Sequence, residues 1–380
     1  MRLTAGMVCI LTMAGLTSPP LAGAETTTGT PPLTVHWLPE TLCLIQRGGG
    51  YGRIIRLQDS RLLCAYSRGP QIRVRASQDE GRSWGPEATV TNYAHGVATN
   101  AEVVQLKDGT ILVGINGRPK DRAHPFTIEC ARSADNGKTW STAQIVYAGG
   151  KTFQTGCWEP AFLELPDGTV QLYFANEAPF PKSHEQEITM VHSADRGMTW
   201  SAPKRVTFRA GHRDGMAVPL LLRDRRTLVV SIEDNGLNGS FKPVLCRTAL
   251  ASPWANAPVL GDSPDRWDPL SVPLARNVYA GAPYICQTAA GHTVLSFQYR
   301  KKPTKKRGWD TTFAVVCVGD PEAKKFGELS YPFASKGNPK SIWNSVFAKS
   351  TDTVTLVSSA TIDGVGGVWA VDGRIVSAKP

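Results

Sequence analysis

The chain lacks several features that would indicate its class directly. After the first 24 residues, no apolar run approaches the ~20 residues that a membrane-spanning helix needs. The cysteines form no C-x-x-C pair, and no nucleic-acid-binding motif accompanies the net charge of +10. Long segments with the 3.6-residue apolar period of a helix are also missing. We therefore expect no membrane span, no nucleic-acid partner, no metal, no cofactor and few helices.

The N-terminus has the pattern of a secretory signal. A basic start at Arg2 precedes an apolar stretch over residues 5–16, and small residues lead up to Ala24. We predict that residues 1–24 are a signal peptide. Residues 25–380 would then form the single domain of a secreted or periplasmic monomer. With 41% hydrophobic and 19% charged residues, this chain can bury a large core.

Three segments share the pattern S-x-D-x-G-x-T/S-W and begin at Ser77, Ser133 and Ser193. In such a segment Ser and Asp can accept hydrogen bonds from a tight turn, Gly can take a positive φ, and Trp can pin the turn by burying its ring. The pattern resembles the Asp-box of sialidase-like β-propellers, where its role is structural. Residues 248–254 resemble a degraded fourth copy. These repeats indicate a fold and no chemistry.

A second repeat consists of an apolar strand, a turn and another apolar strand. It occurs six times, with turns near Asp59, Asp108, Asp167, Asp224, Ala290 and Asp352. Propeller blades recur at this kind of spacing and need ~40 residues or more each, so six blades take up the whole mature chain. We predict an all-β, six-bladed β-propeller of the sialidase-like type.

The open ends of these hairpins, opposite their turns, collect charged and aromatic residues. In an antiparallel hairpin, the start of the first strand and the end of the second lie at the same end. Glu159 and Glu177 therefore come together in the third hairpin, and Glu233 ends the second strand of the fourth. If the hairpins are the inner strands of the blades, these carboxylates face a shared site at one end of the propeller axis.

This combination of side chains suits a sugar. Carboxylates and amides accept hydrogen bonds from hydroxyls, arginines donate them, and aromatic rings stack on an apolar sugar face. Cleavage of a glycosidic bond needs two acidic side chains, which Glu159 and Glu233 can supply from adjacent blades. The candidate substrate-binding residues are Arg53, Trp158, Asn176, Glu177, Arg213, Asp214 and Tyr279.

The same residues also have structural interpretations. Glu159 can simply end a strand beside a proline, and Glu177 can orient a neighbouring group. Arg213 and Asp214 can pair with each other instead of binding a ligand. No role is assigned to the isolated histidines His95, His124 and His212.

Four segments carry a resemblance to a known family: GCWEPAFLELPDGTVQLYFANE, HRDGMAVPLLL, LVVSIEDN and YAGAPYICQ. Over residues 48–298 the chain resembles the exo-α-L-arabinanases, six-bladed propellers that release arabinobiose from linear arabinan with retention. The resemblance implies a secreted retaining exo-glycosidase acting on α-L-arabinan or a related plant cell-wall glycan. It implies Glu159 as general acid/base and Glu233 as nucleophile, or the reverse.

Two other functions stay open. The segment around Arg53 resembles the sialidase F/Y-R-I-P motif, whose Arg binds the carboxylate of sialic acid together with two further arginines. In a sialidase Tyr279 would be the nucleophile, with Glu233 or Glu159 as its base. A non-catalytic sugar-binding propeller would keep the aromatic residues and lack a correctly spaced acid pair.

Overall fold

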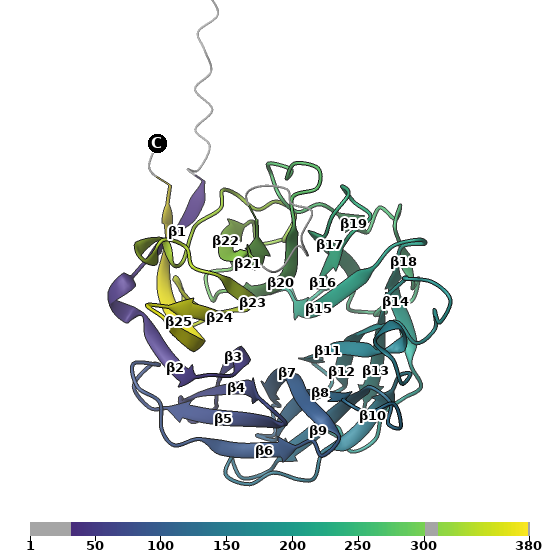
Figure 1. Ribbon diagram of the computed structural model, residues 1–380. Helices are drawn as coiled ribbons and strands as arrows, with labels where there is room; N and C mark the ends of the chain where they lie inside the picture. Colours follow the sequence, from purple (N-terminus) through teal and green to yellow (C-terminus); the bar gives the residue numbers. More distant parts are fainter. Residues whose placement is uncertain (1–31, 301–310, 379–380) are drawn as a thin grey trace, which may run out of the picture. The chain divides into compact units, whose positions relative to one another are not determined.

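The computed structural model describes residues 32–300 and 311–378 (Figure 1). They belong to one compact unit, Pro32–Pro380, and the predicted signal peptide lies outside the described residues. Among the described residues, no helix is long and apolar enough to cross a membrane. The helices in these two stretches are the short 3-10 turns η1 (Pro39–Thr41), η2 (Phe153–Thr155) and η4 (Ala334–Lys336), so the expectation of few helices is confirmed for this part of the chain.

Six sheets, antiparallel except for one short parallel pair at an outer edge, form the blades of a ring, which confirms the predicted all-β, six-bladed propeller (Figure 1). Blade 1 comprises β3 (Gly50–Arg56), β4 (Leu62–Arg68), β5 (Gln71–Ser77) and β6 (Ala88–Asn92). Blade 2 comprises β7 (Gly96–Gln105), β8 (Ile111–Pro119), β9 (Thr127–Ser133) and β10 (Gln144–Ala148). Blade 3 comprises β11 (Cys157–Glu164), β12 (Val170–Asn176), β13 (Glu187–Ser193) and β14 (Lys204–Phe208), with β18 (Val259–Leu260) beside β14.

The other three blades follow the same order from the axis outward. Blade 4 comprises β15 (Asp214–Leu221), β16 (Thr227–Asp234), β17 (Lys242–Ala249) and β19 (Arg266–Trp267). Blade 5 comprises β20 (Ala280–Gln287), β21 (Thr293–Tyr299) and β22 (Phe313–Gly319). Blade 6 comprises β23 (Ser341–Ala348), β24 (Thr353–Ile362) and β25 (Val365–Ser377), and the N-terminal strands β1 (Leu33–Trp37) and β2 (Cys43–Arg47) pair with β25. The two ends of the described chain thus close the ring together.

The first strand of each blade lies innermost and contacts the first strands of both neighbours (Figure 1). The six predicted hairpins are therefore the inner strand pairs of the six blades. Their second strands lie inside the blade stack, which explains their continuous apolar runs: β12 is buried at every position. The predicted turns close these hairpins at one end of the ring. In one of them Asp108 Oδ1 accepts the N–H of Thr110 at 3.0 Å, and Gly109 takes a φ of 91°.

The three predicted Asp-boxes are structural turns at the end of the third strand. In blade 3, Asp195 Oδ1 accepts the N–H of Thr199 at 2.8 Å, and the N–H of Gly197 donates to Ser193 Oγ at 2.7 Å. Gly197 has a φ of 79°. Because the third strand runs back toward the hairpin turn, the Asp-boxes lie at the end of the ring opposite the open ends of the hairpins.

Candidate active site

The inner strand of every blade is interrupted at the same place. Its pairing with the second strand shifts register there, and one residue takes a φ between 50° and 58°. A positive φ costs a residue with a side chain on the order of 1–3 kcal/mol, and a bulge re-aims the side chain it carries. The six residues, here called the bulge ring, are Tyr51, Asn100, Glu159, Met216, Ala282 and Trp343.

Members of the bulge ring from four different blades pack against one another. Tyr51, Met216 and Ala282 form one apolar cluster with Trp343, and the rings of Tyr51 and Trp343 lie 6.2 Å apart. The bulges therefore turn one side chain from each blade toward a common point near the axis. Glu159 is the acidic member of this ring.

Glu159 has a φ of 55° and a partly accessible side chain. Its crowded surroundings remove water and raise the pKa of its carboxyl, and the charge of Glu177 adds to the shift. The charges of Arg118 and Arg213 oppose this shift and favour the ionised form of Glu159. A solvated residue at a strand end would have neither the backbone strain nor these neighbours.

Glu233 is the next-to-last residue of β16 and reaches the neighbouring blade. Its Oε2 accepts the N–H of Ala282, the blade 5 member of the bulge ring, at 2.7 Å. The same link recurs around the ring, where Gln298 accepts the N–H of Trp343 at 2.9 Å and Ser359 accepts the N–H of Tyr51 at 2.8 Å. A glutamine or serine can thus make this contact between blades, so the contact alone does not explain a carboxylate at position 233.

Electrostatics distinguish Glu233 from its counterparts in the other blades. Desolvation raises the pKa of Glu233 to about 7, and the charge of Glu159 adds to the shift, while the Ala282 N–H and the charge of Arg213 oppose it. The two acids predicted from the sequence therefore act on each other through space. A carboxyl with a pKa near 7 is suited to give and take a proton.

Gly281 has no side chain, which leaves room for Glu233 and Tyr279 to pack against its backbone. A Cβ at this position would lie 2.4 Å from Glu233 Oε2 and 2.4 Å from the hydroxyl oxygen of Tyr279, closer than real side chains approach. The Tyr279 hydroxyl also accepts a hydrogen bond from Gln298 Nε2 at 2.9 Å. The structure thus brings the predicted Tyr279 next to Glu233.

Glu177 holds two other predicted residues in place. It is 5% exposed and accepts hydrogen bonds from the indole Nε1 of Trp158 at 2.8 Å and from Nη2 of Arg213 at 2.5 Å. Arg213, fixed in this way, acts on both Glu159 and Glu233. Trp158, Glu177 and Arg213 therefore belong to the group of side chains around Glu159 and Glu233, here called the acid cluster. Within it, Glu177 orients its neighbours, which was the structural interpretation of this residue.

Arg118 also belongs to the acid cluster, although it was not among the substrate-binding residues predicted from the sequence. Its guanidinium lies 4.8 Å from the ring centroid of Trp158, and Nε donates to Asn116 Oδ1 at 2.7 Å. A second hydrogen bond joins it to Asn100 of the bulge ring. Its position at the open end of the β7–β8 hairpin was the available signal. Its pairing with the next blade across Trp158 could not be read from the sequence.

Arg53 pairs with a third carboxylate, that of Glu102. It is 2% exposed, and its Nε donates to Glu102 Oε2 at 3.2 Å. Tyr284 of blade 5 donates to the other oxygen of Glu102 at 3.2 Å, which links blades on opposite sides of the ring. The Arg53 guanidinium lies 4.0 Å from the ring centroid of Tyr51. The charge of Arg53 is thus already matched by a protein carboxylate.

Two predicted substrate-binding residues are placed elsewhere, and these predictions are corrected. Asp214 is fully buried and forms ion pairs with Arg266 at 2.6 Å, so it does not pair with its neighbour Arg213 or reach the acid pair. Asn176 is buried and its amide bonds the hydroxyls of Tyr147 and Thr189. Side chains alternate between the faces of a strand, so Asp214 and Asn176 point into the outer parts of their blades.

Comparison with known proteins agrees with this architecture. Residues 63–332 match the family model described as a BNR repeat-like domain. None of the proteins with curated descriptions matches the chain.

Solved structures share the fold at low sequence identity. An α-L-arabinofuranosidase of Fusarium graminearum in complex with arabinobiose is 18% identical, with a TM-score of 0.64 over 92% of this chain and 96% of that chain. An α-L-arabinanase of Penicillium chrysogenum, also with arabinobiose, is 15% identical, with a TM-score of 0.63 over 92% and 98%. A Hadza microbial sialidase is 15% identical, with a TM-score of 0.57 over 87% and 66%. These similarities establish the sialidase-like fold.

Proposed function

The chain belongs to the BNR repeat-like family, and on this basis we propose that it is a retaining exo-glycoside hydrolase acting on α-L-arabinan or a related plant cell-wall glycan. The observation that carries the proposal is the pair of carboxyls, Glu159 and Glu233, whose charges interact at the open ends of adjacent blades. Retaining hydrolysis needs such a pair, one acid to protonate the leaving oxygen and one carboxylate to attack the sugar.

The surroundings of the two acids favour one distribution of roles. Glu233, with a pKa of about 7, holds its proton at mildly acidic pH and is the proposed general acid/base. Burial raises the pKa of Glu159 as well, but the charges of Arg118 and Arg213 oppose this shift and favour its carboxylate, so Glu159 is the proposed nucleophile. This is the reverse of the first assignment made from the sequence resemblance, which had allowed both.

In the proposed reaction, Glu233 donates its proton to the glycosidic oxygen while Glu159 forms a bond to the anomeric carbon. Glu233, now ionised, then takes a proton from the water that releases the sugar from Glu159. Arg213 is held by Glu177 within reach of both charges and stabilises whichever acid is ionised at each step. Arg118 offers hydrogen-bond donors for a sugar ring, and the exposed ring of Phe153, which stacks on the buried Trp158, offers an aromatic face.

Two fold neighbours support the choice of substrate, since an arabinofuranosidase and an arabinanase were both solved with arabinobiose. A sialidase activity is the second candidate, and the proximity of the Tyr279 hydroxyl to Glu233 favours it. Against it, a sialic acid carboxylate would have to displace Glu102 from the buried Arg53. Breaking a buried ion pair in this way costs on the order of 3–5 kcal/mol.

The test is to incubate the purified protein with linear α-1,5-arabinan and, separately, with a sialylated oligosaccharide, and to identify released sugars by mass spectrometry. Arabinose or arabinobiose release supports the proposal, whereas free sialic acid would replace it with the second candidate. Binding without any product would indicate a sugar-binding propeller. Glu233→Gln should lower turnover on the order of 10²–10⁴-fold. The exposed Glu328→Gln serves as the matched control and should have wild-type activity.

A further inference from the structure

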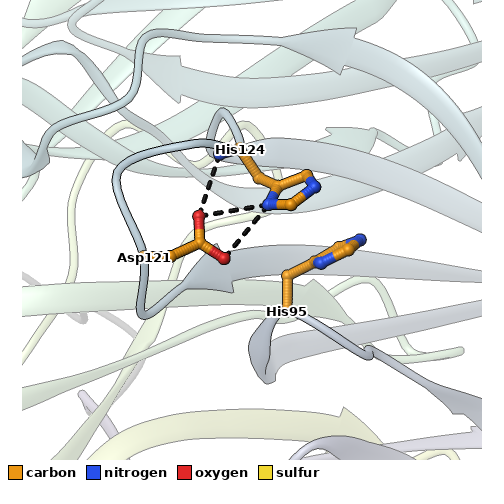
Figure 2. Close-up of side chains that lie close together, drawn as sticks. All are labelled: His95, Asp121 and His124. Carbon is orange, nitrogen blue, oxygen red and sulfur yellow. Dashed lines mark hydrogen bonds and ion pairs between the residues drawn. The ribbon is translucent and has the colours of Figure 1, made fainter.

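Three metal-ligating side chains meet at the open end of blade 2, outside the acid pair (Figure 2). His95 directly precedes β7, while Asp121 and His124 lie in the loop between β8 and β9. One possible ligand atom from each residue lies within 4.8 Å of the other two. His95 and Asp121 are exposed and His124 is partly exposed, so ions can reach the cluster from solvent.

The backbone holds this cluster before any ion binds. Asp121 Oδ1 accepts the N–H of Ala123 at 2.9 Å and the N–H of His124 at 3.0 Å, which fixes the carboxylate in the loop. The N–H of Lys120 donates to the carbonyl of His95 at 2.9 Å and joins the two segments. The imidazole rings of His95 and His124 are stacked, with centroids 3.5 Å apart and planes at 19° (Figure 2).

We propose that His95, Asp121 and His124 form a binding site for a divalent transition-metal ion, with Zn²⁺ as the best-fitting ion. Two imidazoles and one carboxylate with an open fourth position form a ligand set typical of zinc. Calcium and magnesium prefer sites built from oxygen ligands alone. The site does not depend on the proposed glycosidase function.

The distances suit this ion. Ligand atoms about 2.0–2.2 Å from a tetrahedral zinc lie on the order of 3.3 Å from one another. His124 Nδ1 already lies 3.1 Å from each oxygen of Asp121. The exposed ring of His95 then has only to slide out of its stack to supply the third ligand. His95 and His124 also border a cavity of about 290 Å³, which leaves room for a water in the fourth position.

The consequence of binding follows from the position of the site. His95 lies before the first strand of the β7–β8 hairpin, and Asp121 and His124 follow its second strand. A bound ion would therefore clamp the open end of the hairpin that carries Asn100 and Arg118. It would stabilise this end of blade 2 without touching Glu159 or Glu233.

The experiment uses the full chain, stripped of metal with a chelator, and titrates it with Co²⁺ as a spectroscopic substitute for Zn²⁺. The wild type should bind one equivalent with the intense visible absorption of tetrahedral Co²⁺, and Zn²⁺ should displace it. Binding should weaken about tenfold or more in His124→Ala and in Asp121→Asn. His192→Ala, which removes an exposed histidine outside the cluster, should bind as the wild type does.

Thermal unfolding gives an independent measure. Zn²⁺ should raise the melting temperature of the wild type and of the His192→Ala control, because an ion that binds the folded state stabilises it. The rise should disappear in His124→Ala. The proposal is overturned if the wild type fails to bind Co²⁺ or if the cluster variants bind it unchanged. A thiolate charge-transfer band would overturn it as well, since it would place the ion on a free cysteine such as the partly exposed Cys43.

Discussion

Replacing Glu233 with glutamine is expected to stabilise the folded protein at alkaline pH while it strongly lowers the rate of hydrolysis. The surroundings raise the pKa of Glu233 from 4.5 to about 7. Below pH 4.5 its carboxyl is protonated in both the folded and the unfolded chain. As the pH rises, the unfolded chain loses this proton first, so stability falls until the folded carboxyl also ionises near pH 7. Ionised Glu233 is therefore a destabilising feature of the native state at higher pH.

The size of the effect follows from the shift. One pKa unit corresponds to about 1.4 kcal/mol, so the wild type should lose roughly 3 kcal/mol from this group by about pH 8. Glutamine carries no charge and can still accept the Ala282 N–H, as Gln298 does for Trp343 in the next blade. The variant should thus match the wild type within about 1 kcal/mol at pH 5 and exceed it by roughly 3 kcal/mol at pH 8.

Urea denaturation at both pH values, followed by tryptophan fluorescence, measures this difference. Glu328→Gln is the control, because an exposed glutamate should give no such pH-dependent gain. An equal change in the free energy of unfolding at pH 5 and pH 8 would refute the reasoning. It would mean that Glu233 ionises as an ordinary solvated carboxyl does.

Three further predictions concern other parts of the molecule. Gly281→Ala should lower kcat on the order of 100-fold, because the added Cβ displaces Glu233 and Tyr279. The control is Gly327→Ala, where a Cβ meets nothing closer than 3.6 Å and kcat should stay at the wild-type value. Phe153→Ala should raise KM and leave kcat unchanged, because this ring is 68% exposed and can stack on a sugar, while its centroid lies 5.2 Å from that of the Trp158 ring. A fall in kcat alone would contradict this role. Asp195→Ala should lower the melting temperature in calorimetry and leave kcat/KM intact, because its Asp-box lies at the opposite end of the ring; lost activity in the still folded variant would argue otherwise.

The fold could be predicted because its signals are local and repeated. Each Asp-box is closed by hydrogen bonds between residues a few positions apart, such as Asp195 and Thr199. Each hairpin can be recognised from two apolar strands on either side of a polar turn. The closure of blade 6 by β1 and β2 was not predicted, because it joins segments more than 300 residues apart along the chain, as in the pairing of Leu33 with Ser377. Such a pairing leaves no local pattern.

The candidate site was predictable in part, and its errors have a geometric cause. The structure places Trp158, Glu177, Arg213 and Tyr279 near Glu159 or Glu233, and their roles in a site stay predictions. Which side chain points to the axis, however, depends on the bulges, and a shift of one residue moves a side chain to the other face.

Residues at the ends of these strands show the effect. Asp214 lies next to Arg213, yet it turns away to an arginine in β19, 52 residues further along the chain. Asn176, next to Glu177, likewise turns into its own blade. The proximity of His95 and His124 could not be predicted for a similar reason, because no local sequence pattern indicates that two histidines in separate segments lie side by side.

The central claim is that Glu159 and Glu233 act together on one glycosidic bond. The most direct test is to measure kcat/KM on linear arabinan for Glu159→Gln, Glu233→Gln and the double variant, with folding checked by circular dichroism. Residues that act as a unit give non-additive losses. Each single change should therefore lower kcat/KM on the order of 10²–10⁴-fold. The kcat/KM of the double variant should be little lower than that of the less active single variant. Losses that multiply in the double variant, or wild-type activity in either single variant, would contradict the account.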